Sequence, residues 1–126
     1  MLTIGRLAGA AGVNVETVRY YQRIGLLQTP ERPRHGVRAY DDQHLARLRF
    51  IKSAQRLGFT LGEVEALLRL DAGQCTEARA VAEHRLVEVR AKREQLARLE
   101  AALEGVIASC DGSPAERCPL IDSLRQ

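Results

Sequence analysis

The sequence has no tryptophan, and aromatic residues make up only 4% of its 126 positions, whereas charged residues make up 28%. This balance is typical of a helical protein with a limited core and much helix surface in solvent. No apolar run approaches the roughly 20 residues that a membrane-spanning helix needs. The first twelve residues lack the basic and apolar regions of a signal peptide. The sequence therefore favours a cytoplasmic protein with no membrane partner.

Cysteine is also scarce, with Cys75, Cys110 and Cys118 as the three examples. Cytoplasmic thiols stay reduced and three is an odd number, so a disulfide framework is not expected. Three free thiols are therefore candidates for chemistry rather than for cross-linking.

The net charge of +3 is unevenly distributed along the chain. Residues 1–56 hold ten Lys/Arg and four Asp/Glu, a balance of +6, whereas residues 57–126 hold nine and twelve, a balance of −3. A basic front half suggests a surface that contacts nucleic acid.

Two short helices joined by a glycine turn are predicted at the start of the chain. Thr3 is a suitable N-cap for a helix to Ala10, and Gly12 can adopt the positive φ that often ends a helix. Asn14 is a suitable N-cap for a second helix over 15–23. This is the pattern of a helix-turn-helix.

A basic segment with two prolines follows at 30–41 and cannot be a helix interior. Arg34–Arg38 predicts a hairpin tip and Val37–Tyr40 a short strand, so the segment is interpreted as a wing. Asp41 or Asp42 is then expected to cap a third helix ending near residue 57. Thr60 and Glu63 form the capping box of a fourth helix. These boundaries give a winged helix-turn-helix domain at 1–41 and a helical linker at 42–74.

A heptad pattern dominates the second half of the chain. Apolar residues recur every seven positions, at Ala82, Val89, Leu96, Leu103 and Cys110. No later segment is large enough to cover this stretch, so 75–110 is expected to be a dimerisation helix. The alternative is a helix that packs on its own domain. A loop and a short C-terminal turn are expected over 111–126. The predicted fold class is thus mainly α, with a winged helix-turn-helix and a long antiparallel coiled-coil helix.

Seven side chains are candidates for DNA binding. Arginine can bond guanine edges or phosphates, and Thr and Tyr can hold the backbone. The second helix and the wing supply such residues: Thr17, Arg19, Tyr20, Arg23, Arg34, Arg38 and Tyr40. The alternative is an ordinary helical core with surface arginines.

The three cysteines form the candidate metal site. A helix over 76–109 would be roughly 50 Å long at about 1.5 Å per residue, so Cys75 and Cys110 of one chain cannot share a ligand. They can meet if two chains lie antiparallel. Cys110 and Cys118 flank a seven-residue loop that can bring both sulfurs to one ion. Thiolates select soft ions, and three of them disfavour a four-coordinate zinc site and favour Hg(II).

Other roles for the thiols are less well supported. A catalytic thiol needs a supporting histidine, but His35, His44 and His84 lie in no such motif. An iron–sulfur centre generally needs four cysteines. Inert buried thiols remain open. No enzyme activity is therefore expected.

The residues resemble the MerR family of bacterial regulators over almost the whole chain. The resemblance lies in TIGRLAGAAGVNVETVRYYQR, the wing ending in Arg38-Ala39-Tyr40, and FIKSAQRLGFTLGEVEALLRL. The back half, with AEHRL and CPLI, looks like the mercury-responsive members, whose three metal-binding cysteines match Cys75, Cys110 and Cys118.

This resemblance implies a homodimer on a palindromic promoter operator, with RNA polymerase as a second partner and Hg(II) as the effector. It implies repression without metal and activation with metal, when the dimer bends and underwinds an overlong promoter spacer. Each metal site would join Cys75 of one protomer to Cys110 and Cys118 of the partner subunit. The seven-residue loop looks like that of the copper sensors, so Pb, Cd, Zn or Cu(I) sensing is the alternative. The rival class is a metal-buffering or interaction protein without a regulatory role, whose basic half binds partners other than DNA.

Overall fold

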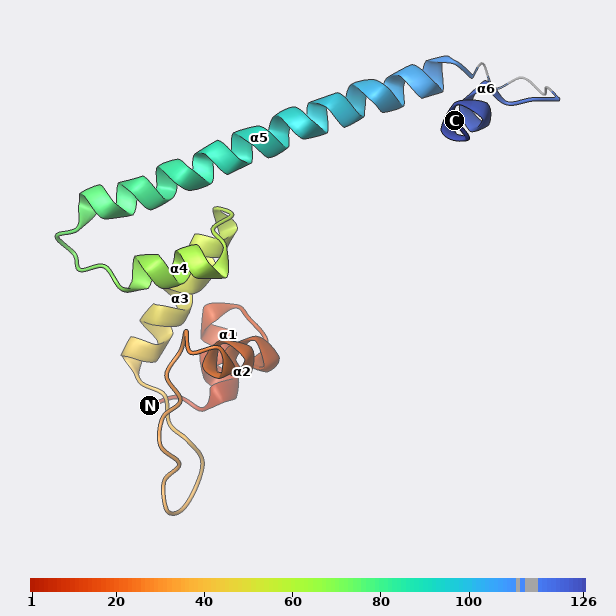
Figure 1. The fold of residues 1–126 in the computed structure, drawn as a ribbon. Helices are drawn as coiled ribbons and strands as arrows, with labels where there is room; N and C mark the ends of the chain where they lie inside the picture. Colours follow the sequence, from red (N-terminus) through yellow and green to blue (C-terminus); the bar gives the residue numbers. More distant parts are fainter. Residues whose placement is uncertain (111, 113–115) are drawn as a thin grey trace. The chain divides into compact units, whose positions relative to one another are not determined.

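The computed structural model describes residues 1–110, 112 and 116–126, and these residues form six helices. In chain order they are α1 (Ile4–Ala11), α2 (Val15–Arg23), α3 (Asp42–Arg56), α4 (Leu61–Leu68), α5 (Cys75–Ala108) and α6 (Pro119–Leu124) (Figure 1). The chain divides into two units, Met1–Val81 and Ala82–Gln126.

The first unit has one small core to which each of its first four helices contributes. α1 packs against α2 and α3, and α4 packs against α3. The fully buried aliphatic side chains of these helices are Leu7, Val18, Leu48, Ile51 and Val64. Burying one such side chain stabilises a fold by about 1.5–3 kcal/mol. This core holds the two helices of the predicted helix-turn-helix in place.

The helix-turn-helix is formed as the sequence predicts. The Thr3 hydroxyl accepts a hydrogen bond from the Arg6 N–H at 3.3 Å, and the Asn14 side chain accepts one from the Thr17 N–H at 2.9 Å. Gly12 ends α1 with φ at 71°, which is the left-handed conformation that favours glycine. Local capping signals therefore fix both helices and the turn between them.

The wing differs from the prediction. The strand expected at Val37–Tyr40 is wrong, because the strand pairing among the described residues is confined to one isolated antiparallel bridge between Leu2 and Tyr40. The predicted hairpin tip does turn at Gly36, where φ is 98°. The segment has no neighbouring sheet to join, and an isolated two-stranded hairpin is only marginally stable. The wing is therefore an extended loop whose last residue, Tyr40, is held by its bridge to Leu2.

Capping boxes begin α3 and α4. Asp41 is the N-cap of α3, and its carboxylate accepts a hydrogen bond from the His44 N–H at 3.0 Å. In α4 the Thr60 hydroxyl accepts from the Glu63 N–H at 3.2 Å, while the Glu63 carboxylate accepts from the Thr60 N–H at 2.8 Å. The predicted capping box of the fourth helix is confirmed.

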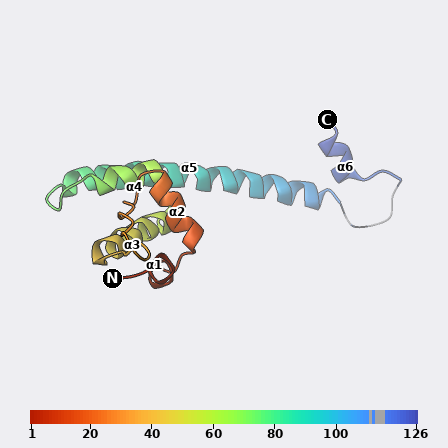
Figure 2. The ribbon, with the colours of Figure 1, turned by 90° about the horizontal axis from the view of Figure 1, so that it is seen from below.

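The long helix α5 is one continuous element of 34 residues (Figure 2). It begins and ends one residue earlier than the sequence predicts, which is within the usual uncertainty of helix ends. α5 is described along its whole length, and none of its residues is buried. The seam side chains Val89, Leu96 and Leu103 are 44%, 65% and 60% exposed. Over the described ranges, no helix has the length and apolarity to cross a membrane.

After Cys110 the predicted loop falls partly on residues 111 and 113–115, which lie outside the described residues. The expected C-terminal turn is the helix α6, which has Pro119 as its first residue. Proline suits this position because the first helical N–H has no partner within the helix.

Candidate DNA-binding surface and metal site

The second helix turns one face to the core and the other to solvent. Val18 and Tyr21 are buried, whereas Arg19, Tyr20 and Arg23 are exposed. The Arg23 guanidinium lies 5.8 Å from the centre of the Tyr20 ring, and Arg19 pairs with the carboxylate of its helix neighbour at 3.1 Å. Both members of that pair are more than half exposed, so it contributes at most about 1 kcal/mol. Arg19 is therefore free to exchange this partner for a ligand.

Thr17 has a different environment from the other predicted residues of α2. Its hydroxyl and its backbone N–H both donate to the Asn14 side chain, at 2.8 and 2.9 Å. These bonds fix the start of α2. The contribution of Thr17 to DNA binding that the sequence suggests remains a prediction.

The wing residues are placed in two environments. Arg34 and Arg38 are exposed. Tyr40 is only 2% exposed, and its hydroxyl accepts a hydrogen bond from the Gln22 amide at 2.8 Å. The structure gives Tyr40 a packing role in the free chain, because its ring lies in the core. Its phosphate contact stays a prediction. Among the predicted DNA-binding residues, Tyr40 has the least exposed surface with which to make such a contact.

A basic pocket of about 590 Å³ lies between α2 and the wing. Its guanidinium groups come from Arg19 and Arg23 on α2 and from Arg32 and Arg38 on the wing. Arg32 and Gln22, which also line the pocket, are not among the residues that the sequence predicts to bind DNA. Arg32 belongs to the same basic run as Arg34, which was the available signal. Gln22 lies three positions after Arg19, but only the fold shows what it contacts.

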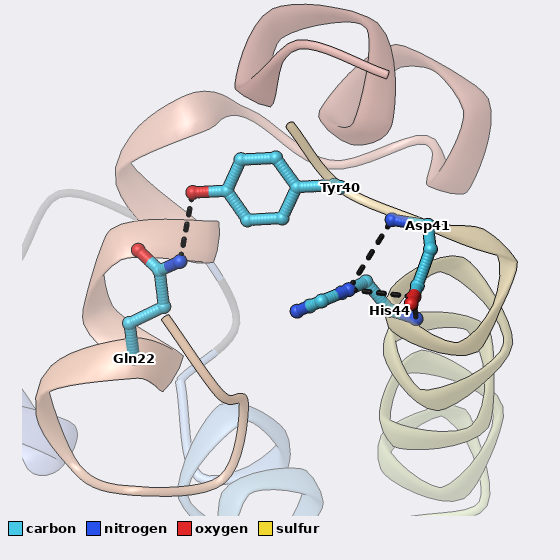
Figure 3. A network of polar contacts seen from close by, with 4 residues as sticks. All are labelled: Gln22, Tyr40, Asp41 and His44. Atoms are coloured by element: carbon cyan, nitrogen blue, oxygen red, sulfur yellow. Dashed lines mark hydrogen bonds and ion pairs between the residues drawn. The ribbon is translucent and has the colours of Figure 1, made fainter. Parts of the chain in front are cut away.

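Figure 3 shows a polar network around Tyr40, which joins α2, the end of the wing and α3. The His44 ring meets the Tyr40 ring edge-on, with 5.2 Å between centroids, and its Nδ1 lies 2.7 Å from the Asp41 carboxylate. Hydrogen bonds from the backbone N–H and the ring of His44 lower the pKa of the Asp41 carboxyl. The charged carboxylate thus caps the first turn of α3, and the His44 ring packs against Tyr40 at the end of the wing.

Some basic side chains of the front half serve the fold instead of a ligand. Arg47 Nε donates to the Leu26 carbonyl at 2.6 Å, just after α2. Lys52 Nζ donates to the carbonyls of Ala11 and Gly12, at 3.1 and 2.6 Å. Both side chains come from α3, so this helix holds the helix-turn-helix at its turn and beyond its end.

Tyr21 supports the same arrangement from α2. Its buried hydroxyl donates to the Gln55 side chain of α3. Burial raises the pKa of Tyr21 above its ordinary value of 10.0. The tyrosine therefore stays neutral while it joins the two helices.

The three cysteines are free thiols, with Cys75 exposed and Cys110 and Cys118 half-buried. Cys75 is the first residue of α5, Cys110 comes two residues after its end, and Cys118 is the N-cap of α6. Among residues 1–110, 112 and 116–126, no three His, Cys, Asp or Glu side chains lie close enough to hold a metal ion. The two ends of a 34-residue helix are about 50 Å apart. Three thiols are the donors that soft ions prefer, but Cys75 and Cys110, at opposite ends of one helix, cannot both reach one ion within a single chain.

The helix-turn-helix with its exposed arginines defines the class of the molecule, a DNA-binding protein. The comparison with protein families then identifies the family. The description "MerR HTH family regulatory protein" matches residues 2–71, and "MerR, DNA binding" matches residues 45–106. The chain belongs to the MerR family of transcriptional regulators and is not an enzyme.

Known proteins resemble the chain over nearly its whole length. A mercuric resistance operon regulatory protein of Shigella flexneri is 51% identical over 98% of this chain and 88% of that protein. The lead(II) complex of PbrR691 from Ralstonia metallidurans CH34 has a TM-score of 0.84 and 35% identity, over 98% of this chain and 99% of that one. The mercury(II) complex of MerR from Bacillus megaterium MB1 has a TM-score of 0.77 and 36% identity, over 99% and 100%.

Proposed function

We propose that the protein is a mercury(II)-responsive regulator of a mercuric-resistance operon. The observation that carries the proposal is the place of the free thiols, with Cys75 at the start of α5 and Cys110 and Cys118 beyond its end, in a chain with relatives named for mercuric resistance. Residues 1–41 form the DNA-binding domain, and residues 42–74 form a helical linker that couples it to the rest of the chain. Residues 75–110 form the dimerisation helix, and residues 111–126 complete the metal site. Without metal the protein represses transcription, and with metal it activates it.

The exposed seam of α5 supports a homodimer. Leu96, Leu99 and Leu103 are each more than half exposed in the single chain, although they follow the heptad pattern of a coiled coil. An antiparallel pair of α5 helices buries these side chains. It also brings Cys75 of one protomer to Cys110 and Cys118 of the partner subunit. Two-fold symmetry then gives two metal sites and a palindromic operator.

The basic surface of the first unit supports the DNA contacts. Arg19, Tyr20 and Arg23 enter the major groove, Thr17 positions their helix, and Arg34, Arg38 and Tyr40 hold phosphates beside it. In the cytoplasm the dimer acts at a promoter together with RNA polymerase. Distorting promoter DNA costs a few kcal/mol, which contacts elsewhere can offset.

The decisive test is a metal titration of the purified full chain, followed by thiolate-to-metal charge-transfer absorption in the ultraviolet. Hg(II) should bind at two ions per dimer and should raise transcription from a promoter with the operator in an overlong spacer. The Cys75→Ala chain is the control and should lose both responses. Binding of Hg(II) without any change in transcription would contradict the regulatory role and favour a metal-buffering protein.

The alternative effector is another soft ion, Pb(II), Cd(II), Zn(II) or Cu(I). The seven residues between Cys110 and Cys118 keep this alternative open, because loop length limits the size and geometry of the site. The same titration with each ion separates the candidates. If Pb(II) binds more tightly and activates transcription more strongly than Hg(II), the effector is lead and not mercury.

A further inference from the structure

The basic pocket between α2 and the wing contains one polar contact that joins its two sides. On one side lie Arg19, Gln22 and Arg23 of α2, and on the other lie Arg32 and Arg38 of the wing. Among the described residues that line this pocket, none is acidic. Arg32 and Arg38 have no hydrogen bond or ion pair with the part of the chain that the structure describes. Four guanidinium groups around one pocket suit a polyanion such as a sugar–phosphate backbone.

Tyr40 is the fixed end of the wing. Its backbone N–H and carbonyl form two 2.7 Å hydrogen bonds with Leu2, and the next residue is the N-cap of α3. Arg38 lies two residues before Tyr40, at most about 7 Å along an extended chain. The position of Tyr40 therefore limits where the Arg38 guanidinium can reach.

Gln22 is the side chain that ties this fixed point to α2. Its Nε2 donates to the Tyr40 hydroxyl at 2.8 Å in a partly buried setting (Figure 3). Gln22 directly precedes Arg23 and follows Arg19 by three positions, so all three project from neighbouring parts of one helix. A hydrogen bond away from bulk water holds its geometry better than an exposed one.

We propose that Gln22 is a positioning residue for DNA binding: through Tyr40 it fixes the wing arginines beside those of α2, so that both groups hold one stretch of DNA backbone. The inference rests on the DNA-binding role given above. In this role Gln22 does not contact DNA itself, but acts through its hydrogen bond to Tyr40.

The test is a set of variants of the full-length chain, with operator binding measured by fluorescence anisotropy across a salt series. Gln22→Met keeps the side-chain length and removes the donor, and Tyr40→Phe keeps the ring and removes the hydroxyl. Gln43→Met is the matched control, because Gln43 is exposed on α3. Each test variant should weaken binding about 3- to 10-fold, since one hydrogen bond and part of a phosphate contact are lost.

Two further readouts separate positioning from direct contact and from folding. The Gln22→Met/Tyr40→Phe double variant should bind no more weakly than the weaker-binding of the two single variants, because both changes break the same hydrogen bond. The slope of log affinity against log salt should become less steep by up to about 0.9, the value for one fully lost phosphate contact. Arg38→Ala should then cost less affinity in the Gln22→Met chain than in the wild type.

Multiplying losses in the double variant, or an equal cost of Arg38→Ala in both backgrounds, would overturn the positioning role. An unchanged salt slope with a lowered melting temperature would overturn it as well, because it would make the hydrogen bond merely structural. A wild-type chain that binds duplex DNA no better than an Arg19→Ala/Arg23→Ala chain would instead contradict the DNA-binding role itself, and this inference with it.

Discussion

At the residue scale, two groups of basic side chains in the first unit have different surroundings. Arg47 and Lys52 donate to backbone carbonyls and hold the helices together. Arg19, Arg23 and Arg38 line an open basic pocket. The first group is engaged with the fold, whereas the second faces an open pocket, so substitutions in the two groups should have different effects.

Arg19→Ala should weaken operator binding by about 1–3 kcal/mol, the range for an arginine that contacts a base or phosphate. The measurement is a gel shift at constant ionic strength. Arg69→Ala is the control, because it removes the same charge from an exposed ion pair on α4. If Arg19→Ala binds the operator as tightly as the control does, Arg19 does not contact DNA.

Asp41 should make the stability of the protein depend on acid pH. Hydrogen bonds from His44 lower the folded-state pKa of Asp41 below its ordinary value of 3.8. The carboxylate therefore stabilises the fold above about that pH, and this contribution is lost as the pH falls through the lower folded-state pKa. The difference in unfolding free energy between the wild type and Asp41→Asn should shrink on acidification from pH 6 to pH 2.

Urea unfolding at several pH values measures that difference. Asparagine is a good N-cap, so the substitution keeps the cap and removes only the titration. A difference that stays constant over the whole range would show that the Asp41–His44 contact does not stabilise the folded state.

At the element scale, each helix boundary follows from a few local residues. Thr3, Asn14 and Thr60 each cap a helix where the sequence predicts, because a cap needs only a side-chain oxygen beside the first free N–H groups. The strand predicted in the wing failed because a strand needs a partner, which is not a local property. For α5 the helix itself was predicted correctly, because its heptad pattern can be read along the chain. Burial of its apolar seam is not a local property either, since it would require a second chain.

Leu103→Glu should prevent the proposed dimerisation through α5. Leu103 lies on the heptad seam, and two-fold symmetry would bury two unpaired carboxylates in each dimer, at several kcal/mol each. Sedimentation equilibrium should show a monomer. The control is Ala101→Glu, which places the same charge on the opposite side of the helix and should leave the dimer intact. Equal behaviour of the two variants would rule out this seam as the interface.

At the scale of the whole molecule, the proposed metal site belongs to two chains. Mixing a Cys75→Ala chain with a Cys110→Ala chain should produce heterodimers with one complete three-thiol site. Neither homodimer has a complete site, so the mixture should bind Hg(II) tightly where the separate proteins do not. Ultraviolet charge-transfer absorption after unfolding and refolding the mixture measures this. If mixing restores no tight binding, the proposed arrangement with thiols from both chains is wrong.

The sequence by itself determined the helices, their caps, the helix-turn-helix and the spacing of the thiols along α5. These features depend on residues that are at most a few positions apart, or on a regular repeat, so they can be read along the chain. The family follows from the same residues.

Only the tertiary structure decided which polar residues make contacts within the fold and which line the open basic pocket. Burial of Tyr40, its bond from Gln22 and the carbonyl contacts of Lys52 join residues 18 to 41 positions apart. No local pattern encodes such pairs, because they depend on how the helices pack around a shared core. The sequence therefore indicates which residue types could bind DNA, and the fold shows which of them also pack against other helices.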